Sequence, residues 1–254
     1  MADVFKITGG HPLRGEIAIS GAKNSASKMM IATLLTQDEV ILSNVPRQQE
    51  TEITQEIITT VGARVEWVDE HTLKTSTPSI TSNSVRELSR KNRISVLAIA
   101  PLLHRAGEAF VPLVGGDKIG PRPVNFHVTA LEKMGALIEE TTEGYHATAP
   151  KGLKGALIEL PYPSVGATET ALLAGVLAKG RTMIRNAAGE PEIKELIMML
   201  QNMGAIIQVN ANRSIEIIGV EKLHGTQARV MPDRIEAASY GSMALGTAGE
   251  IFVR

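Results

Sequence analysis

Apolar and polar positions recur along the chain in one pattern. Four times, an apolar run ends in a short polar turn and a strand-like segment follows. Such a change from helical to alternating spacing predicts a helix followed by a strand. The four segments begin at Leu34, Leu102, Val176 and Ala244.

Glycines mark the ends of further predicted helices. Gly62, Gly135 and Gly204 each follow an amphipathic stretch and recur about every 70 residues, the spacing of a supersecondary unit. Each suits a helix C-cap, where a positive φ is needed. Two strand-like segments around a tight turn follow, as in RVEWVDEHTLKTS and IIQVNANRSIEIIG. The pattern predicts an α/β domain of three helix-strand-helix-strand-strand units over about residues 21–228.

A fourth copy of the unit starts near Asp233 and reaches only its first strand at Arg254. Because an unpaired strand leaves its partners uncovered, we expect residues 229–254 to be the start of a second, truncated domain. Residues 1–20 resemble a strand pair outside the three copies. We assign this pair to the same second domain.

Composition narrows the class of protein. The 254 residues carry a net charge of −1 and include no cysteine, which excludes disulfides and thiolate metal sites. The near-neutral charge argues against a nucleic-acid partner. The start lacks a signal peptide, and no apolar run is long enough for a bilayer. We therefore expect a cytoplasmic protein with no membrane partner.

Metal and cofactor sites are not predicted. The six histidines are scattered without metal-ligand spacing, and no Walker loop or GxGxxG motif is present. His104 and His127 are interpreted as structural. Any chemistry is expected where the three copies differ from one another.

The stretch GAKNSASK, residues 21–28, places small residues and Lys23 at the start of a predicted helix. Backbone N–H groups at a helix N-terminus, together with an ammonium, suit a phosphate or carboxylate. A solvated helix start explains the same residues equally well. An anion site and an exposed helix end therefore remain alternatives.

The loop GGDKIGPRP, residues 115–123, is richer in glycine than its counterparts in the other copies. Its glycines let the backbone approach a ligand closely. Lys118 and Arg122 supply positive charge for phosphate, and the Asp117 carboxyl can exchange a proton with a substrate. A plain surface loop does not require these residues together, so we favour a functional loop.

Two more helix starts carry candidate residues. Arg93, in KNRIS, is either a clamp for carboxylate or phosphate or, as we favour without further context, a surface arginine. In PSVGATE, Ser164 and Thr168 offer donors to a ligand, and an ordinary N-cap explains them just as well.

Six motifs follow one another along the chain: GAKNSA, KNRIS, GGDKIGPRPVNFH, SVGATE, AAGEPEI and PDRIE. Their order resembles that in the enolpyruvyl transferases, in particular the branch that acts on UDP-N-acetylglucosamine. The related 3-phosphoshikimate enzymes share the repeat but usually lack the RPV and SVGATE motifs. The resemblance implies an inside-out α/β barrel domain, a second domain that is largely missing here, and an active site between the two.

The resemblance also implies a role for each matched position. It places Lys23 and Asn24 at the sites for phosphoenolpyruvate and the nucleotide sugar, and Arg93 and Arg122 on one of these substrates. Asp117 takes the position that is cysteine in many members and aspartate in some. The residues implied to line the uridine pocket are Arg122, Pro123, Val124, Asn125, Phe126, Ser164, Val165 and Gly166.

The implied reaction transfers enolpyruvyl from phosphoenolpyruvate to the sugar 3-hydroxyl, the first committed step of peptidoglycan synthesis. The hydroxyl attacks C2, C3 takes a proton, and phosphate leaves. Asp117 is implied as the acid, and Lys23 as the group that stabilises negative charge. Further catalytic groups belong to the second domain, so the isolated chain is expected to need that domain or a partner chain.

Two alternatives remain. One is a non-catalytic remnant or partner domain that binds a UDP-sugar. The other, which the SVGATE and RPV motifs disfavour, is the shikimate-pathway transferase.

The identity of Asp117 leads to a prediction for a complete enzyme with this sequence. Asp117→Asn should lower the rate about 10²–10⁴-fold, because an amide cannot act as the acid. Asp117→Cys should stay active and become sensitive to fosfomycin, the epoxide that alkylates the family's thiolate at this position. Mass spectrometry after incubation with the epoxide checks this. A stoichiometric adduct on the unmutated protein, or a near-normal rate for Asp117→Asn, would contradict the assignment.

Overall fold

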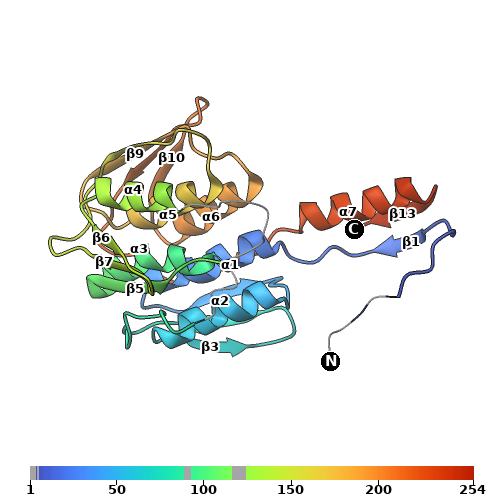
Figure 1. Cartoon of the computed structure of the whole chain (residues 1–254), viewed down its shortest axis with the longest axis horizontal. Helices are drawn as coiled ribbons and strands as arrows, with labels where there is room; N and C mark the ends of the chain where they lie inside the picture. Colours follow the sequence, from blue (N-terminus) through green and yellow to red (C-terminus); the bar gives the residue numbers. More distant parts are fainter. Residues whose placement is uncertain (1–3, 5, 89–92, 116–123) are drawn as a thin grey trace.

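The computed structural model describes residue 4 and residues 6–88, 93–115 and 124–254. Within this part, a body of helices is flanked by three small sheets, and one helix with two strands extends to the side (Figure 1). Every helix of the described part is too short or too polar to cross a lipid bilayer.

The predicted units are present, each as helix, strand, helix, strand and strand. The first unit contains α1 (Lys23–Ala32), η1 (Thr33–Leu35), β2 (Val40–Ser43), α2 (Gln49–Thr60), β3 (Arg64–Trp67) and β4 (Leu73–Ser76). The second contains η2 (Ile94–Ala98), α3 (Ile99–Ala106), β5 (Glu108–Pro112), α4 (Asn125–Lys133), β6 (Leu137–Glu140) and β7 (Gly144–Thr148). The third contains α5 (Val165–Gly175), β9 (Arg181–Arg185), α6 (Pro191–Asn202), β10 (Ile206–Val209) and β11 (Ile215–Ile218).

The glycines predicted to end helices do so. Gly62, Gly135 and Gly204 follow α2, α4 and α6 with φ of 115°, 96° and 100°. A side chain is strained in this left-handed region, which explains why glycine stands at each place.

Short link segments join each unit to the sheet of the next. The strands of one unit are antiparallel, and a link adds in parallel at the edge. The link β8 (Leu157–Glu159) follows the second unit and pairs with β9, and Ser84 follows the first unit and bridges to Phe110 in β5. The link β12 (Gln227–Arg229) follows the third unit and pairs with β2 of the first. The links therefore close the three units into a ring.

Two asparagines hold equivalent links. Asn44 and Asn186 follow β2 and β9 with φ of 58° and 55°, a conformation that asparagine tolerates better than most residues. The side-chain amide of Asn44 donates to the Val230 carbonyl (2.7 Å), and that of Asn186 donates to the Leu160 carbonyl (3.0 Å). The internal repeat thus extends to single hydrogen bonds.

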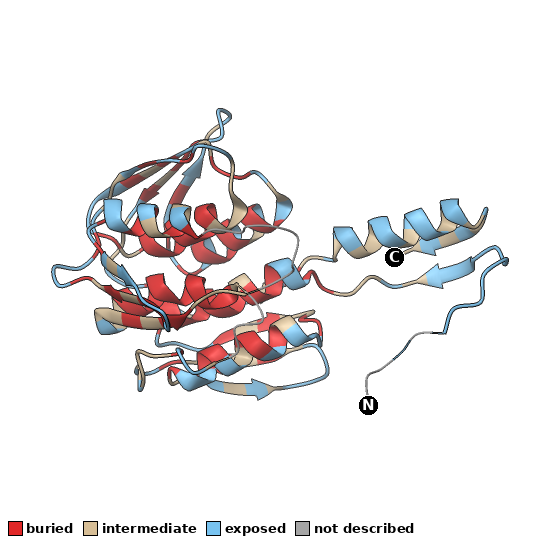
Figure 2. Ribbon diagram, viewed as in Figure 1, coloured by how far each residue is buried: buried red, intermediate tan, exposed pale blue. Residues whose placement is uncertain are grey.

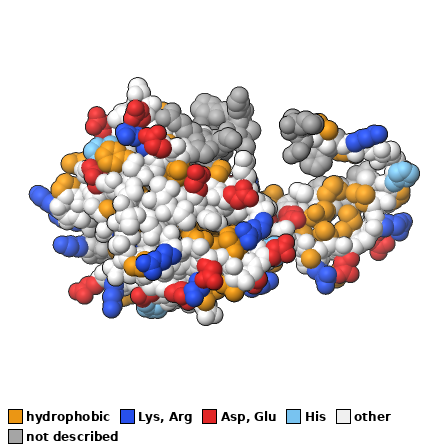
Figure 3. Space-filling view, turned by 90° about the horizontal axis from the view of Figure 1, so that it is seen from below, with side chains coloured by type: hydrophobic (Ala, Val, Ile, Leu, Met, Phe, Trp, Pro, Cys, Tyr) orange, Lys and Arg blue, Asp and Glu red, His pale blue; other side chains and the backbone are white. Residues whose placement is uncertain are grey.

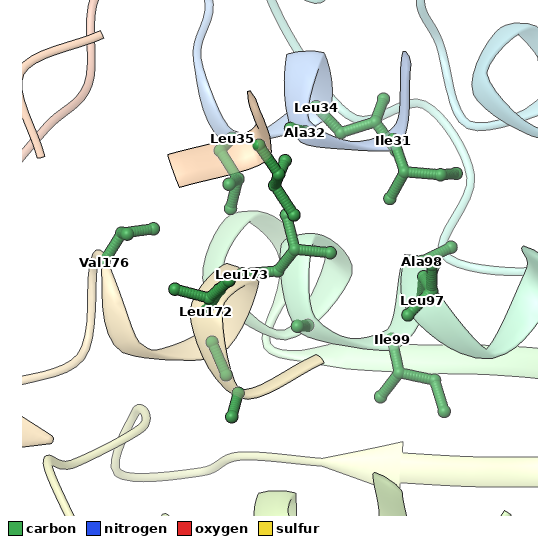
Figure 4. Close-up of a cluster of buried hydrophobic side chains, with 14 of the residues drawn as sticks. Ile31, Ala32, Leu34, Leu35, Leu97, Ala98, Ile99, Leu172, Leu173 and Val176 are labelled. Carbon is green, nitrogen blue, oxygen red and sulfur yellow. The ribbon is translucent and has the colours of Figure 1, made fainter. Parts of the chain in front are cut away.

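The helices α1, α3 and α5 form the centre of the body, and they are the most buried of its α-helices (Figure 2). In α5, every residue from Ala167 to Gly175 is buried, which suits its small and apolar sequence. Aliphatic side chains from these helices and from η1 and η2 meet in one cluster (Figure 4). The labelled members are Ile31, Ala32, Leu34, Leu35, Leu97, Ala98, Ile99, Leu172, Leu173 and Val176.

The extension consists of β1 (Arg14–Ile17), α7 (Arg234–Gly246) and β13 (Glu250–Val253). The helix and strand predicted for the fourth copy are present, and β13 pairs in parallel with β1. The described residues before Gly21 form only this one strand, whereas a strand pair was expected there. Gly9, Gly10 and Pro12 interrupt the segment before β1, and these residue types are depleted in strands.

Candidate functional site

A cavity of about 640 Å³ opens among the starts of the helices. Its lining includes first-turn residues of α1, α4, α5, α6 and α7 and residues at the start of η2. The first N–H groups of a helix have no partners within it and carry partial positive charge, so this arrangement suits an anionic ligand. The described lining residues are Asn24, Lys28, Arg93, Ile94, Leu97, Asn125, Phe126, His127, Tyr162, Ser164, Val165, Gly166, Glu169, Glu190, Glu192 and Arg234.

Several residues that the sequence singled out meet at this cavity. Val124 is buried directly before α4, whereas Lys23 is absent from the described lining. Asp117, Arg122 and Pro123 lie outside the described residues. The predicted residues that line the cavity are Asn24, Arg93, Asn125, Phe126, Ser164, Val165 and Gly166.

The start of α5 is held by its own polar side chains. The Ser164 hydroxyl accepts a hydrogen bond from the Ala167 amide (3.3 Å), so Ser164 is an N-cap that also lines the cavity. The Thr168 hydroxyl donates to the Ser164 carbonyl (2.8 Å) and accepts from the Ala188 amide (3.0 Å). Thr168 therefore fixes α5 to the segment that leads into α6.

Gly166 allows α4 and α5 to approach closely at the cavity. A Cβ at Gly166 would lie 2.8 Å from Cε1 and 3.0 Å from Nε2 of His127. Nδ1 of His127 is hydrogen-bonded to the Thr170 hydroxyl (2.7 Å), which holds the ring in place. Burial, and secondarily the charge of Arg93, lowers the His127 pKa to about 4. The ring is therefore neutral near pH 7 and has a packing role, although it also lines the cavity.

Two aromatic rings stand at the cavity. Phe126 and Tyr162 meet edge to face, with ring centroids 5.3 Å apart and an interplanar angle of 71°. Tyr162 is 56% exposed. Rings in this position can pack against a planar group of a ligand.

Glu50 on α2 brings two lysines of α1 together. Its Oε1 lies 3.5 Å from Nζ of Lys28 and accepts a hydrogen bond from the Ser27 hydroxyl (2.9 Å). Its Oε2 lies 3.8 Å from Nζ of Lys23. Lys23, implied to act on phosphoenolpyruvate, thus shares a counter-ion with Lys28, which the sequence did not single out.

Glu169 is the one acidic residue of α5, and it is buried at the cavity. Burial raises the pKa of its carboxyl to about 7 from the ordinary 4.5. The charge of Lys28 opposes this shift. The carboxylates of Glu50, Glu192 and Glu190 add to it.

Two glutamates of α6 connect the body to the extension. Glu192 accepts hydrogen bonds from Nε and Nη2 of Arg234 at 2.9 and 3.2 Å, so α7 starts beside the cavity. Glu195 accepts from the Met231 amide (2.6 Å) and from the Ser25 hydroxyl on α1. Burial is the main cause that raises the Glu195 pKa.

Sequence reasoning missed several charged residues of this cavity, although some signals were present. Lys28 lies four residues after Asn24, which puts both on one face of α1. Glu169 stands alone as a charge in the helix VGATETALLAG. Glu190, Glu192 and Arg234 belong to the AAGEPEI and PDRIE motifs, to which no role was given.

A family model described as EPSP synthase (3-phosphoshikimate 1-carboxyvinyltransferase) matches residues 7–254. The chain belongs to the enolpyruvyl transferase family. The predicted α/β fold agrees with solved members of this family. The enolpyruvyl transferase NikO from Streptomyces tendae superposes with a TM-score of 0.78 at 23% identity, covering 91% of this chain and 55% of that one. EPSP synthase from Acinetobacter baumannii superposes with a TM-score of 0.70 at 20% identity, covering 91% of this chain and 53% of that one.

Curated relatives of this enolpyruvyl transferase chain are named UDP-N-acetylglucosamine 1-carboxyvinyltransferase. The protein of Protochlamydia amoebophila is 45% identical over 99% of this chain and 56% of its own length. The protein of Chlamydia abortus is 46% identical over 99% of this chain and 57% of its own length. The protein of Gluconobacter oxydans is 46% identical over 99% of this chain and 60% of its own length. The chain therefore spans somewhat more than half the length of these relatives.

Replacing Gly166 should disturb the contact between α4 and α5. Gly166→Ala places a methyl group against a His127 ring that Thr170 holds, and we expect a loss of about 1–3 kcal/mol in the free energy of unfolding. Urea unfolding measures the loss. Gly241→Ala is the matched control, because a Cβ there meets no atom within 4 Å. Equal stability of the two variants would contradict the close contact.

Glu169 should make stability depend on pH. Its pKa is higher in the folded than in the unfolded state, so the free energy of unfolding should fall as pH rises from about 4.5 to about 7. Glu169→Gln, which keeps the neutral shape, should remove the part of this fall that Glu169 causes and exceed wild type above pH 7 by up to about 3 kcal/mol. Urea unfolding between about pH 5 and 8 tests this. Glu159→Gln, on exposed β8 surface, should keep the wild-type slope.

Proposed function

We propose that this chain carries part of the active site of a UDP-N-acetylglucosamine 1-carboxyvinyltransferase. The reaction moves enolpyruvyl from phosphoenolpyruvate to the sugar 3-hydroxyl and releases phosphate. In a cell it supplies the first committed step of peptidoglycan synthesis, in the cytoplasm. The substrates and the pathway are part of this proposal, because the chain spans only part of the length of the relatives that bear this name.

The cavity lined by helix starts is the observation that carries the proposal. Both proposed substrates are anions, and first-turn residues of α1, α4, α5, α6 and α7 line one space. The relatives' names favour a UDP-sugar over 3-phosphoshikimate, even though the family model bears the shikimate enzyme's description.

The proposed roles follow the chemistry of the side chains. Arg93 and Arg122 bind substrate phosphate or carboxylate, and Lys23 stabilises the negative charge that develops and departs. Asp117 delivers the proton to C3 of phosphoenolpyruvate while the hydroxyl attacks C2. For Asp117 to hold that proton, its pKa must be raised by burial or by the substrate anions.

The remaining predicted residues form the nucleotide-sugar side of the site. The edge-to-face pair of Phe126 and Tyr162 offers a surface for the uracil ring. Asn24 offers an amide to the sugar or to phosphoenolpyruvate. The other residues proposed to surround the uridine are Pro123, Val124, Asn125, Ser164, Val165 and Gly166.

We also propose that residues 1–20 and 229–254 belong to a second domain, beside the three-unit domain of residues 21–228. None of the residues of α7 is buried, whereas α1 and α5 are mostly buried. Hydrophobic side chains gather on the extension (Figure 3), where Met243, Leu245 and Phe252 are 43%, 86% and 63% exposed. Further repeat units packed on this face would cover it, as the first three units cover one another.

A binding role without turnover is the second candidate for the isolated chain. The share of the relatives' length that it spans favours this candidate, because catalysis needs groups fixed on both sides of the substrates. The two candidates differ in phosphate release, which only turnover produces.

We expect the purified chain to bind UDP-N-acetylglucosamine weakly and to release little or no phosphate from phosphoenolpyruvate. Arg93→Ala and Arg122→Ala should each weaken binding about tenfold or more, because a charged hydrogen bond contributes roughly 1.5–3 kcal/mol. Calorimetry measures the affinity, and Arg64→Ala on exposed β3 surface is the control. Unchanged affinity in both arginine variants would contradict the proposed roles of Arg93 and Arg122. A steady rate on the order of 1–10 per second would contradict the requirement for a second domain.

A further inference from the structure

Lys28 and Glu169 place opposite charges inside the cavity. The Lys28 side chain is 14% exposed and Glu169 is 2% exposed, and both line the space that would hold the substrates. They come from different units, on α1 and α5. Neither has a role in the enolpyruvyl transfer proposed above.

Carboxylates surround this pair on several elements. Glu50 reaches it from α2, Glu192 from α6 and Glu190 from the N-cap of α6. Among the described residues that act on Glu169, Lys28 is the positively charged one. Three carboxylates and one ammonium group of the described chain therefore act on Glu169 itself.

Two histidines lie on the other helices of the described chain that pack against α5, namely α3 and α4. From α3, the Nε2 atom of His104 is hydrogen-bonded to the Ala174 carbonyl (2.8 Å), and burial lowers the His104 pKa. From α4, His127 is held neutral by burial and bound to Thr170. Arg93, before η2, acts on His127 and also lines the cavity.

An anion in this cavity interacts unfavourably with each ionised carboxylate, and the low dielectric of a buried site strengthens that repulsion. Glu192 accepts two hydrogen bonds from Arg234, and Glu50 is paired with two lysines. Glu169 is the most deeply buried of these acids, it lines the cavity, and burial raises its pKa. Protonation of Glu169 therefore lowers the electrostatic cost of admitting a negatively charged ligand.

We propose that Glu169 takes up one proton from solvent when an anionic substrate enters the cavity, and that Lys28 then interacts with the substrate instead of with the carboxylates. The proton binds a carboxylate oxygen of Glu169, and no other bond forms or breaks. This inference rests on the proposed function for the identity of the substrate. It makes Glu169 a binding residue that couples affinity for the nucleotide sugar to pH.

Calorimetry with UDP-N-acetylglucosamine tests the coupling. The diphosphate of this ligand does not titrate near neutral pH, so any proton taken up belongs to the protein. Titration at about pH 7.5 in two buffers of different ionisation enthalpy gives the number of protons bound per ligand. For the wild-type chain we expect net uptake, and a Kd that rises by up to about tenfold per pH unit above pH 7.

Three variants separate this coupling from a structural effect. Glu169→Gln should bind with no uptake through this group and with a Kd that does not change between about pH 6.5 and 8.5. Lys28→Met should bind the ligand more weakly and take up fewer protons per ligand, because Glu169 without the nearby lysine charge already holds its proton before the ligand binds. Glu159→Gln, outside the cavity, should behave as wild type. Equal uptake by wild type and Glu169→Gln, or no uptake by wild type, would overturn the inference.

Failure of the proposed function gives a different result. If no variant binds UDP-N-acetylglucosamine, the proposed substrate is wrong, and the same titrations are made with sulfate, a dianion that does not titrate near neutral pH. Sulfate binding with proton uptake that Glu169→Gln abolishes would support the coupling alone. Sulfate binding without such uptake, or no sulfate binding, would overturn it.

Discussion

Burial of three helices on all sides is the constraint on which the rest of the structure depends. A helix surrounded by other elements cannot place charged side chains along its length, because each would lose its hydration. Some hydroxyl groups within these helices bond to the helix backbone, as when Ser27 donates to the Lys23 carbonyl (2.9 Å). Lys28 and Glu169, which α1 and α5 do carry, stand at the cavity near the helix starts. Burial thus concentrates the chemistry at one end of the helices.

The ring of links holds the starts of the three helices in position relative to one another. Each link adds a strand to the sheet of the next unit, and β12 returns from the third unit to the first. The sheets then cover the outer faces of the helices (Figure 1). The starts of the helices remain grouped around the cavity. Arg105 strengthens the contact between units, because its guanidinium donates to the carbonyls of Leu34, Thr36 and Thr77 at 2.8–2.9 Å.

The sequence predicted the repeat well, because its signals are local. Apolar spacing and the glycines after α2, α4 and α6 determine the units whatever their partners. The links β8 and β12 could not be predicted in this way, since three residues show no periodicity and their pairing depends on a distant unit. The same limit applies to the cavity. Motifs identified Asn24 and Ser164, whereas the importance of Lys28 and Glu169 depends on elements that meet only in the folded chain.

The two points where the chain enters and leaves the body lie side by side, and this affects how the chain folds. Gly21 and Pro232 are bridge partners, and the Ala22 amide donates to the Met231 carbonyl (2.7 Å), so the body starts and finishes at one point. Topologically, residues 21–232 form an insertion whose two ends touch. Such a segment can form its ring of three units before the extension folds. Closing the ring places no conformational constraint on the flanking residues. A circular permutant that joins these ends and opens a surface hairpin would preserve all three units.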